Sequence, residues 1–381
     1  RSVVVTGVQT CALPILDWGK TSVSKEEYYS LLSTIAIKND SETLKALVSA
    51  FSQPVVSLMS LPYIALFCSS VGEFINHSGI TEVQLKNGSP LSISDVRNKL
   101  KLFSEKYGQL KNRILKADAD QDDAFREKLR FKWLAPLNIH YNLGVFFTSD
   151  GKIIGNTQYV YHMFQDRKFS RNRLEGKAVQ EFGEVLGTII QSVCTGLSGF
   201  LPEYKTEVFY KRFPIFYKDY NTNRSVNFFP SYEDGKEMSL RILHLVCSVN
   251  FIRYILGEIV PWENIWSLRV KYITVYYVYR SLERFQNRYP NEEIRTTLDC
   301  NRSIIDSSFR GCMMHYGFTN HGISIIKDEF LGLDKALFGV VESCFDGMTY
   351  EQLSKKLDSA INQFSDLLSD MAVIDTSHRK L

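Results

Sequence analysis

Apolar residues recur at helical spacing through much of the chain, most regularly in its second half. The first such run covers residues 24–52, where Ser24 is placed to cap a helix. The last run covers residues 350–371, and its apolar positions share one helical face. They are Leu353, Leu357, Ile361, Phe364, Leu368 and Met371. Both runs therefore predict amphipathic helices.

Further runs between these two also predict helices. They cover residues 178–200, 237–257, 262–289 and 298–316. Pro261 stands at the start of the third run and Pro290 stops it, because proline is tolerated at the first helical position but not in the interior. This third helix is apolar nearly all round, so we expect it at the centre. From residue 236 onward the pattern predicts a bundle of four to five helices.

Strand signals are confined to the region before residue 236. The turn pairs Asn87-Gly88 and Asp150-Gly151 predict two hairpins, and a strand-like stretch surrounds residues 221–223. The predicted fold class is therefore mainly α. A C-terminal bundle of four to five helices follows an N-terminal α+β region with two or three short hairpins.

Two polar segments follow the first hairpin. Ser94 and Asp95 are placed to cap a polar helix that runs to about residue 115. Residues 116–128 carry aspartates at calcium-loop spacing, but they lack the glycine and the glutamate that such a loop requires. We expect a solvated acidic turn there.

Three regions follow from these patterns. Residues 1–15 include VTGVQTCALPI, which reads like the conceptual translation of a short-read sequencing adapter, so we expect this tail to lie outside the fold. Residues 16–235 form the predicted α+β region. Residues 236–381 form the predicted helical domain.

Residues 46–72 carry no charge and are long enough to span a bilayer. However, the segment contains Pro54 and Pro62, and no cluster of Lys or Arg flanks it. We expect a buried pair of core helices broken at the prolines, no membrane partner and a cytoplasmic protein.

The net charge and the cysteine spacing exclude few classes of function. The formal charge of +3 over 381 residues means that any nucleic-acid surface must be local. Six cysteines lie beyond the adapter-like tail, and none forms a CxxC pair. They predict neither a zinc site nor a disulfide framework, so we expect reduced thiols, no metal and no cofactor.

Two basic segments contain aromatic residues and are candidates for RNA contact. Their basic residues are Arg167, Lys168, Arg171 and Arg173 in the first and Lys211 and Arg212 in the second. A solvated loop or helix face is the more common explanation of the first segment, and a half-buried β-ribbon is the more common explanation of the second.

The stretch FRGCMMHYGF, residues 309–318, holds Arg310 and His315 near the end of a predicted helix. On a helical wheel these two side chains lie about 140° apart, so they do not share a face. Asp306 precedes Arg310 by four residues, which predicts an ion pair. Gly317 predicts a left-handed helix end that could bring the two side chains together.

This helix resembles the signature helix of the HEPN superfamily, in which an arginine, four to six residues and a histidine lie near a helix end. Arg310 and His315 match that spacing, and Tyr316-Gly317 resembles the exit from the family's helix. The resemblance covers residues 238–375. It departs from the family at Gly311, where asparagine, aspartate or histidine is usual.

The resemblance implies a metal-independent endoribonuclease or an RNA-binding effector, with a toxin or defence role. It also implies that residues 16–235 are a sensing or substrate-positioning region. Arg310 would stabilise charge on a phosphate and His315 would act as general acid or base. The family resemblance also implies a homodimer through this helix, whose small residues Ser308 and Gly311 allow close approach. The alternative is a non-enzymatic helical interaction protein in which Arg310 and His315 are structural.

Overall fold

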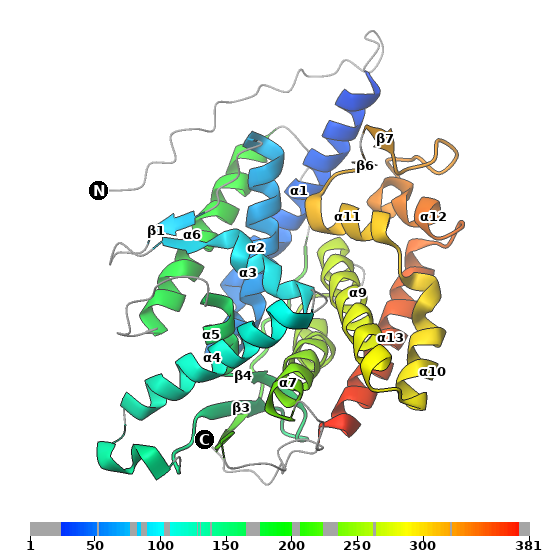
Figure 1. The fold of residues 1–381 in the computed structure, drawn as a ribbon. Coiled ribbons are helices and arrows are strands. Elements are labelled where there is room, and N and C mark those ends of the chain that lie inside the picture. Colours follow the sequence, from blue (N-terminus) through cyan, green and yellow to red (C-terminus); the bar gives the residue numbers. More distant parts are fainter. Residues whose placement is uncertain are drawn as a thin grey trace.

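The structure, a computed structural model, describes residues 24–372 with internal gaps (Figure 1). The gaps are residues 52, 77–81, 85–89, 103–106, 128, 130, 138, 165–175, 200–205, 224–234, 262–263 and 321. The adapter-like tail therefore lies outside the described residues. Within them, the fold is mainly helical with short antiparallel strands, which confirms the predicted class.

Long helices make up most of the fold. They are α1 (Lys25–Ala50), α2 (Pro54–Asn76), α4 (Tyr107–Glu127), α6 (Gly176–Leu197), α7 (Gly235–Phe251), α9 (Ile265–Arg288), α10 (Glu292–Asn301), α11 (Ser307–His315) and α13 (Tyr350–Met371). Shorter helices connect them: α3 (Ile93–Asn98), η1 (Lys99–Lys101), η2 (Lys132–Leu137), α5 (Gln158–Phe164), the π-helical turn η3 (Ile252–Leu256), α8 (Gly257–Ile259), η4 (Arg302–Ile304), η5 (Ala336–Gly339) and α12 (Val340–Cys344).

The first and last of these helices follow the sequence pattern closely. Ser24 caps α1 in a capping box with Glu27, and Thr349 caps α13 in the same way. The apolar face of α13 is buried as predicted, from Leu353 to Leu368. Side-chain caps and a continuous apolar stripe thus fix both helices locally.

The strands form three small antiparallel sheets. Their bounds are β1 (Glu82–Gln84), β2 (Pro90–Ser92), β3 (Leu143–Phe147), β4 (Ile153–Asn156), β5 (Phe216–Tyr220), β6 (Thr319–Asn320) and β7 (Ile323–Ser324). Both predicted hairpins are confirmed, as β1 pairs with β2 and β3 pairs with β4 around Gly151 at φ 82°. Strand β5 adds to β3, while the hairpin of β6 and β7 was not predicted.

Helix α2 begins at Pro54 as predicted, but it continues through Pro62. The predicted break there is wrong, since close packing on all sides outweighs the one hydrogen bond that a proline removes. Helix α2 and the helix at residues 235–259 are long and apolar enough to cross a membrane. However, 89% and 78% of their apolar windows are buried inside the protein, as in core helices.

The acidic segment after the first hairpin is helical, so the predicted acidic turn is wrong. It belongs to α4, and its Asp118 and Asp122 face the protein interior. Asp122 accepts hydrogen bonds from His140 (2.9 Å) and Asn142 (2.8 Å). The sequence also predicted one polar helix from Ser94 to about residue 115, and this prediction is wrong. Ser92 caps α3, and the chain leaves η1 through a left-handed Leu102.

Two predicted helix boundaries in the C-terminal half are also wrong. Asn264, not Pro261, starts α9, because its side chain accepts from the N–H groups of Trp266 and Ser267. The predicted helix over residues 298–316 is two helices, α10 and α11, joined by η4. The central position predicted for α9 holds, since nearly all its residues from Trp266 to Phe285 are buried.

One continuous hydrophobic core joins the two regions expected from sequence. Helix α1 packs on α6 and α9, α2 packs on α11, and α7 lies against β4. Figure 1 shows α9 in the middle, with α1, α2 and α6 on one side and α10, α12 and α13 on the other. The C-terminal helices therefore share their core with the N-terminal region.

Candidate functional site

Helix α11 carries Arg310 and His315 and is fixed at its start by Asp306. The Asp306 carboxylate accepts from the Phe309 N–H at 2.6 Å, and Phe309 and Cys312 are buried beneath it. The predicted ion pair between Asp306 and Arg310 does not occur among the described residues. Asp306 acts as the N-cap instead.

Side chains from two other helices hold the end of α11. Arg269 of α9 donates to the carbonyls of Cys312 (3.2 Å) and Met313 (2.8 Å), and Ser70 of α2 donates to that of Met314. The left-handed residue is Tyr316, at φ 57°, rather than the predicted Gly317. Carbonyls left unpaired at the helix end thus receive buried donors.

Tyr316 takes this conformation because its side chain is held in the core. Its hydroxyl donates to Asp40 of α1 at 2.5 Å, and Arg269 donates to the same carboxylate oxygen at 2.7 Å. The Arg269 guanidinium lies 3.8 Å from the Tyr316 ring centroid. We call Asp40, Arg269 and Tyr316 the buried triad. It ties the residue after His315 to α1 and α9.

His315 itself points to solvent. Its Nδ1 lies 3.0 Å from Glu73 Oε2 at the end of α2, and the two side chains are 48% and 43% exposed. Arg97 of α3 donates to the other Glu73 oxygen at 2.5 Å. Burial raises the pKa of Glu73, but the bonds from His315 and Arg97 outweigh it, so the net pKa is lowered.

Arg310 contacts two tyrosines of α9, Tyr276 and Tyr277. Its guanidinium lies 5.7 Å from the Tyr276 ring centroid and donates to the Tyr277 hydroxyl. Burial raises the pKa of Tyr277, whereas the positive charges of Arg310 and Arg97 lower it. Both arginines therefore lie close to one phenol.

Arg310 thus contacts tyrosines of α9, while Arg97 and His315 share the Glu73 carboxylate, and the charge of Arg97 also acts on Tyr277. We call these five residues the α11 site. The buried Nε atoms of Arg97 and Arg310 have no hydrogen-bond partner among the described residues.

Of the other predicted RNA contacts, only Lys211 and Arg212 lie among the described residues, and they are not part of this site. Arg167, Lys168, Arg171 and Arg173 lie outside the described residues. Lys211 and Arg212 are exposed on a segment bonded to α8, where Lys211 pairs with Glu258. No described contact joins them to α11.

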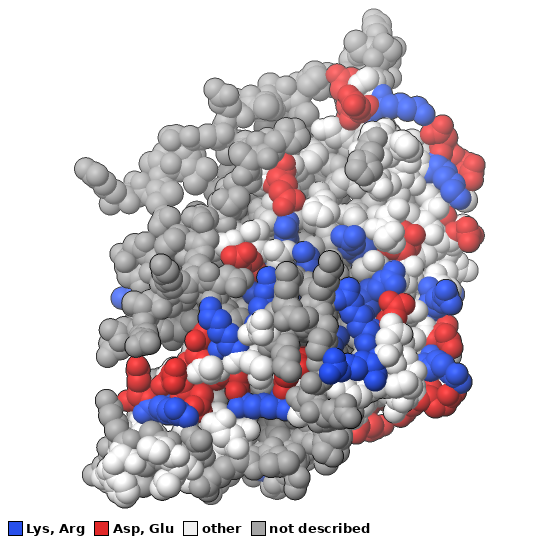
Figure 2. All heavy atoms as spheres, in the orientation of Figure 1, with Lys and Arg blue, Asp and Glu red and all other residues white. Residues whose placement is uncertain are grey.

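Sequence reasoning missed Glu73, Arg97 and Tyr277, which come from three other helices. It also missed the arginines of α9, whose regular spacing was a readable signal. Arg280, Arg284 and Arg288 recur every fourth residue and so share one face. Figure 2 shows Lys and Arg side chains gathered on the face over α9.

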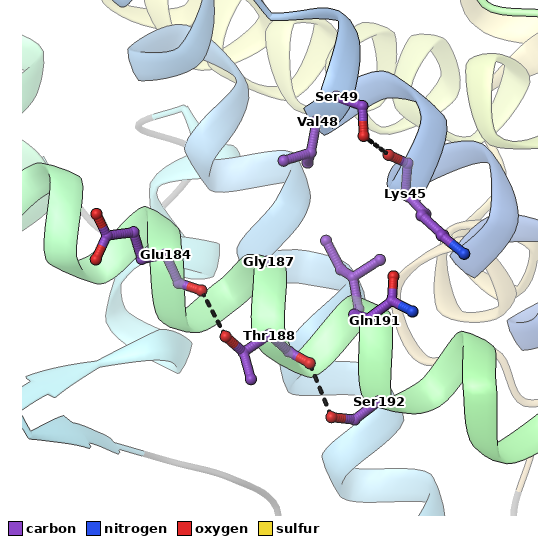
Figure 3. A pocket seen from close by; sticks show the side chains of 9 residues that line it. Lys45, Val48, Ser49, Glu184, Gly187, Thr188, Gln191 and Ser192 are labelled. Atoms are coloured by element: carbon purple, nitrogen blue, oxygen red, sulfur yellow. Dashed lines mark hydrogen bonds between the residues drawn. The ribbon is translucent and has the colours of Figure 1, made fainter. Parts of the chain in front are cut away.

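A separate groove of about 500 Å³ lies between α1 and α6 (Figure 3). Its hydroxyls are engaged within their own helices, as Thr188 and Ser192 donate to the carbonyls of Glu184 and Thr188, each at 2.9 Å. No group of three or more metal-ligating side chains occurs in the described part of the chain. The groove therefore offers no chemistry comparable to the α11 site.

Comparison with protein families, curated proteins and solved structures gave no match.

Proposed function

We propose that the α11 site binds RNA and cleaves it without a metal ion, as a HEPN-like endoribonuclease of the cytoplasm. One observation carries this proposal. An exposed histidine is held by a carboxylate that also accepts from Arg97, and Arg310 lies on the same helix as that histidine. This set can bind a phosphate and move a proton beside it.

His315 is oriented for proton transfer. Because the Glu73 carboxylate can only accept, Nδ1 of His315 carries the proton that joins them. Its Nε2 then holds a free lone pair in the neutral imidazole. Such a nitrogen can take the proton of a ribose 2′-OH.

The reaction that fits is transesterification within the RNA strand. The 2′-oxygen attacks the adjacent phosphorus, the bond to the 5′-oxygen breaks, and that oxygen takes a proton. The products are a 2′,3′-cyclic phosphate and a free 5′-hydroxyl. Arg310 and Arg97 stabilise the charge on the non-bridging oxygens.

A second copy of the chain supplies the partner in this proposal. Ser308 and Gly311 lie on α11, and a Cβ built at Gly311 meets nothing within 4 Å. That open surface allows another α11 to approach and bring a second His315 as the acid. A toxin or defence role belongs to the same proposal.

One observation favours the non-enzymatic alternative. Arg310 and His315 each already contact a side chain of the fold, namely Tyr277 and Glu73. In an interaction protein these contacts would serve only to join α11 to α9 and α2.

The test uses the full chain, a mixed single-stranded RNA pool and excess chelator, with product ends as the readout. The wild type is expected to give cyclic phosphate ends, and His315→Ala to lower the rate by roughly 10²-fold or more. Stability should change by no more than about 0.5 kcal/mol, because His315 lies outside the core.

Lys355→Ala on α13 is the matched control, since it removes another exposed side chain far along the sequence from α11. Equal cleavage by the wild type and His315→Ala would refute the proposal. So would activity that disappears in chelator. Binding without cleavage in every variant would leave the interaction protein as the better account.

A further inference from the structure

A row of arginines follows one face of α9. Arg280, Arg284 and Arg288 are spaced by four residues, and Arg284 and Arg288 are exposed. We call these three residues the α9 arginine row. The Lys and Arg side chains gathered over α9 in Figure 2 form a basic face on a protein whose net charge is only +3. A local basic face of this kind needs an anionic partner or many counter-ions.

The row begins at the α11 site. The Tyr276 ring is flanked by Arg310, 5.7 Å from its centroid, and by Arg280, at 5.4 Å. Arg280 also lies 5.9 Å from the Tyr279 ring centroid. The tyrosines of α9 therefore join the proposed cleavage site to the first arginine of the row.

Aromatic contacts also hold these arginines in place. Arg280 lies between Tyr276 and Tyr279 and pairs with Glu283 at 2.9 Å, and Arg288 lies 5.6 Å from the Tyr289 ring centroid. Arg288 also donates from Nε to the Tyr289 hydroxyl at 3.2 Å. A guanidinium already held in this way loses less freedom on binding, and its terminal N–H groups are the ones that a phosphate would meet. Glu283 offsets part of the charge of Arg280.

We infer that the α9 arginine row binds the backbone of a single RNA strand that extends beyond the cleaved phosphate. The inference rests on the proposed function, from which it takes RNA as the ligand. Four helical residues advance roughly 6 Å, which is of the order of the step between successive phosphates in an extended strand. A single row of arginines on one helix matches the phosphates of one RNA strand, whereas a duplex presents the phosphates of two strands.

The inference predicts that RNA affinity depends on strand length. From Arg280 to Arg288 the row extends roughly 12 Å along the helix axis. An oligonucleotide that fills only the α11 site misses these contacts. A strand a few nucleotides longer gains them and should bind more tightly.

The experiment measures binding by fluorescence anisotropy, using the full chain with His315→Ala so that the RNA stays intact. Labelled single strands of about four and about twelve nucleotides are titrated over a range of salt concentrations. The test variant adds Arg284→Gln and Arg288→Gln. The control adds Lys355→Gln and Lys356→Gln, which remove two exposed charges from α13.

The longer strand should bind several-fold more tightly than the shorter one, and the test variant should lose this advantage. The slope of log affinity against log salt should fall in magnitude by about 1.4 for the two lost contacts, at about 0.7 for each on a single strand. The control should keep the slope of its parent.

Several results would overturn the inference. One is a test variant that keeps the slope and the length dependence, even if the wild type cleaves RNA. Another is equal or tighter binding of duplex RNA, or row-dependent binding of phosphatidylserine vesicles in place of RNA. Conversely, row-dependent RNA binding by a protein that never cleaves RNA would remove the proposed activity and support the row.

Discussion

Two arginine–carboxylate pairs contact the end of α11, and they differ chiefly in their access to solvent. Arg269 and Asp40 are each 1% exposed at the side chain, with Tyr316 beside them. Arg97 and Glu73 are 13% and 43% exposed, with His315 beside them. Asp40 and Glu73 thus each accept a hydrogen bond from one arginine. Each also accepts one from one of two consecutive residues, Tyr316 for Asp40 and His315 for Glu73.

Burial gives these similar sets different consequences. In the buried triad the charges are removed from water, so each depends on its partner and any loss leaves an uncompensated charge. Around Glu73 water screens the charges, so the contacts contribute little to stability and His315 remains accessible. The first set fixes the backbone at residue 316, and the second leaves residue 315 available to a ligand.

Removing the buried arginine should give the largest effect. Arg269→Ala leaves Asp40 without its ion pair and frees the carbonyls of Cys312 and Met313, so we expect a loss of about 3–5 kcal/mol of unfolding free energy. Denaturant unfolding measures it. Arg97→Ala is the less buried counterpart, whose partner Glu73 is 43% exposed, and should cost about 1 kcal/mol or less.

If Arg269→Ala does not fold, Tyr316→Phe tests the same triad more gently. It removes the hydroxyl that donates to Asp40 and should cost about 1–3 kcal/mol. Equal costs at Arg269 and Arg97 would show that burial does not separate the two sets.

Gly311→Ala should give a smaller effect of opposite sign. The position is helical, and a Cβ built there meets nothing within 4 Å, so unfolding free energy should rise by about 0.5–1 kcal/mol. Thermal unfolding measures this rise. If α11 faces a second copy, sedimentation should also show weaker self-association. A loss of monomer stability would contradict the open space at this position.

The smallest effect concerns pH and Glu73. Because the folded pKa of Glu73 is lowered from 4.5, its contribution to stability is present above that value and is lost as the pH falls below it. Glu73→Gln should therefore flatten the dependence of unfolding free energy on pH below about 4.5 and lower stability at neutral pH by the same small amount, a few tenths of a kcal/mol. An unchanged acid profile would mean that His315 and Arg97 do not favour the carboxylate.

Elements defined by local chemistry could be predicted from the sequence. Ser24 and the stripe of α13 were sufficient because capping and amphipathic spacing act within a few residues. The boundary between α10 and α11 was missed, since Asp306 competes as a new N-cap inside an apolar run that otherwise reads as one helix. The interior Pro62 was misread because only tertiary packing decides it.

Only part of the candidate site could be predicted from the sequence. Arg310 and His315 share one helix, so their spacing could be read directly. Glu73 and Arg97 lie more than 200 positions earlier, and no local pattern links them to α11. The separation of the two motif residues on the wheel was correct, and their link depends on helices that spacing alone does not place.

The buried triad has a mechanical consequence for the exposed histidine. Tyr316 holds a backbone conformation that costs a bulky residue about 1 kcal/mol or more, and Asp40 of α1 keeps it there. An aspartate 276 positions earlier in the chain therefore holds the backbone of the residue next to His315. The geometry at residue 315 thus depends on the packing of the first helix of the fold.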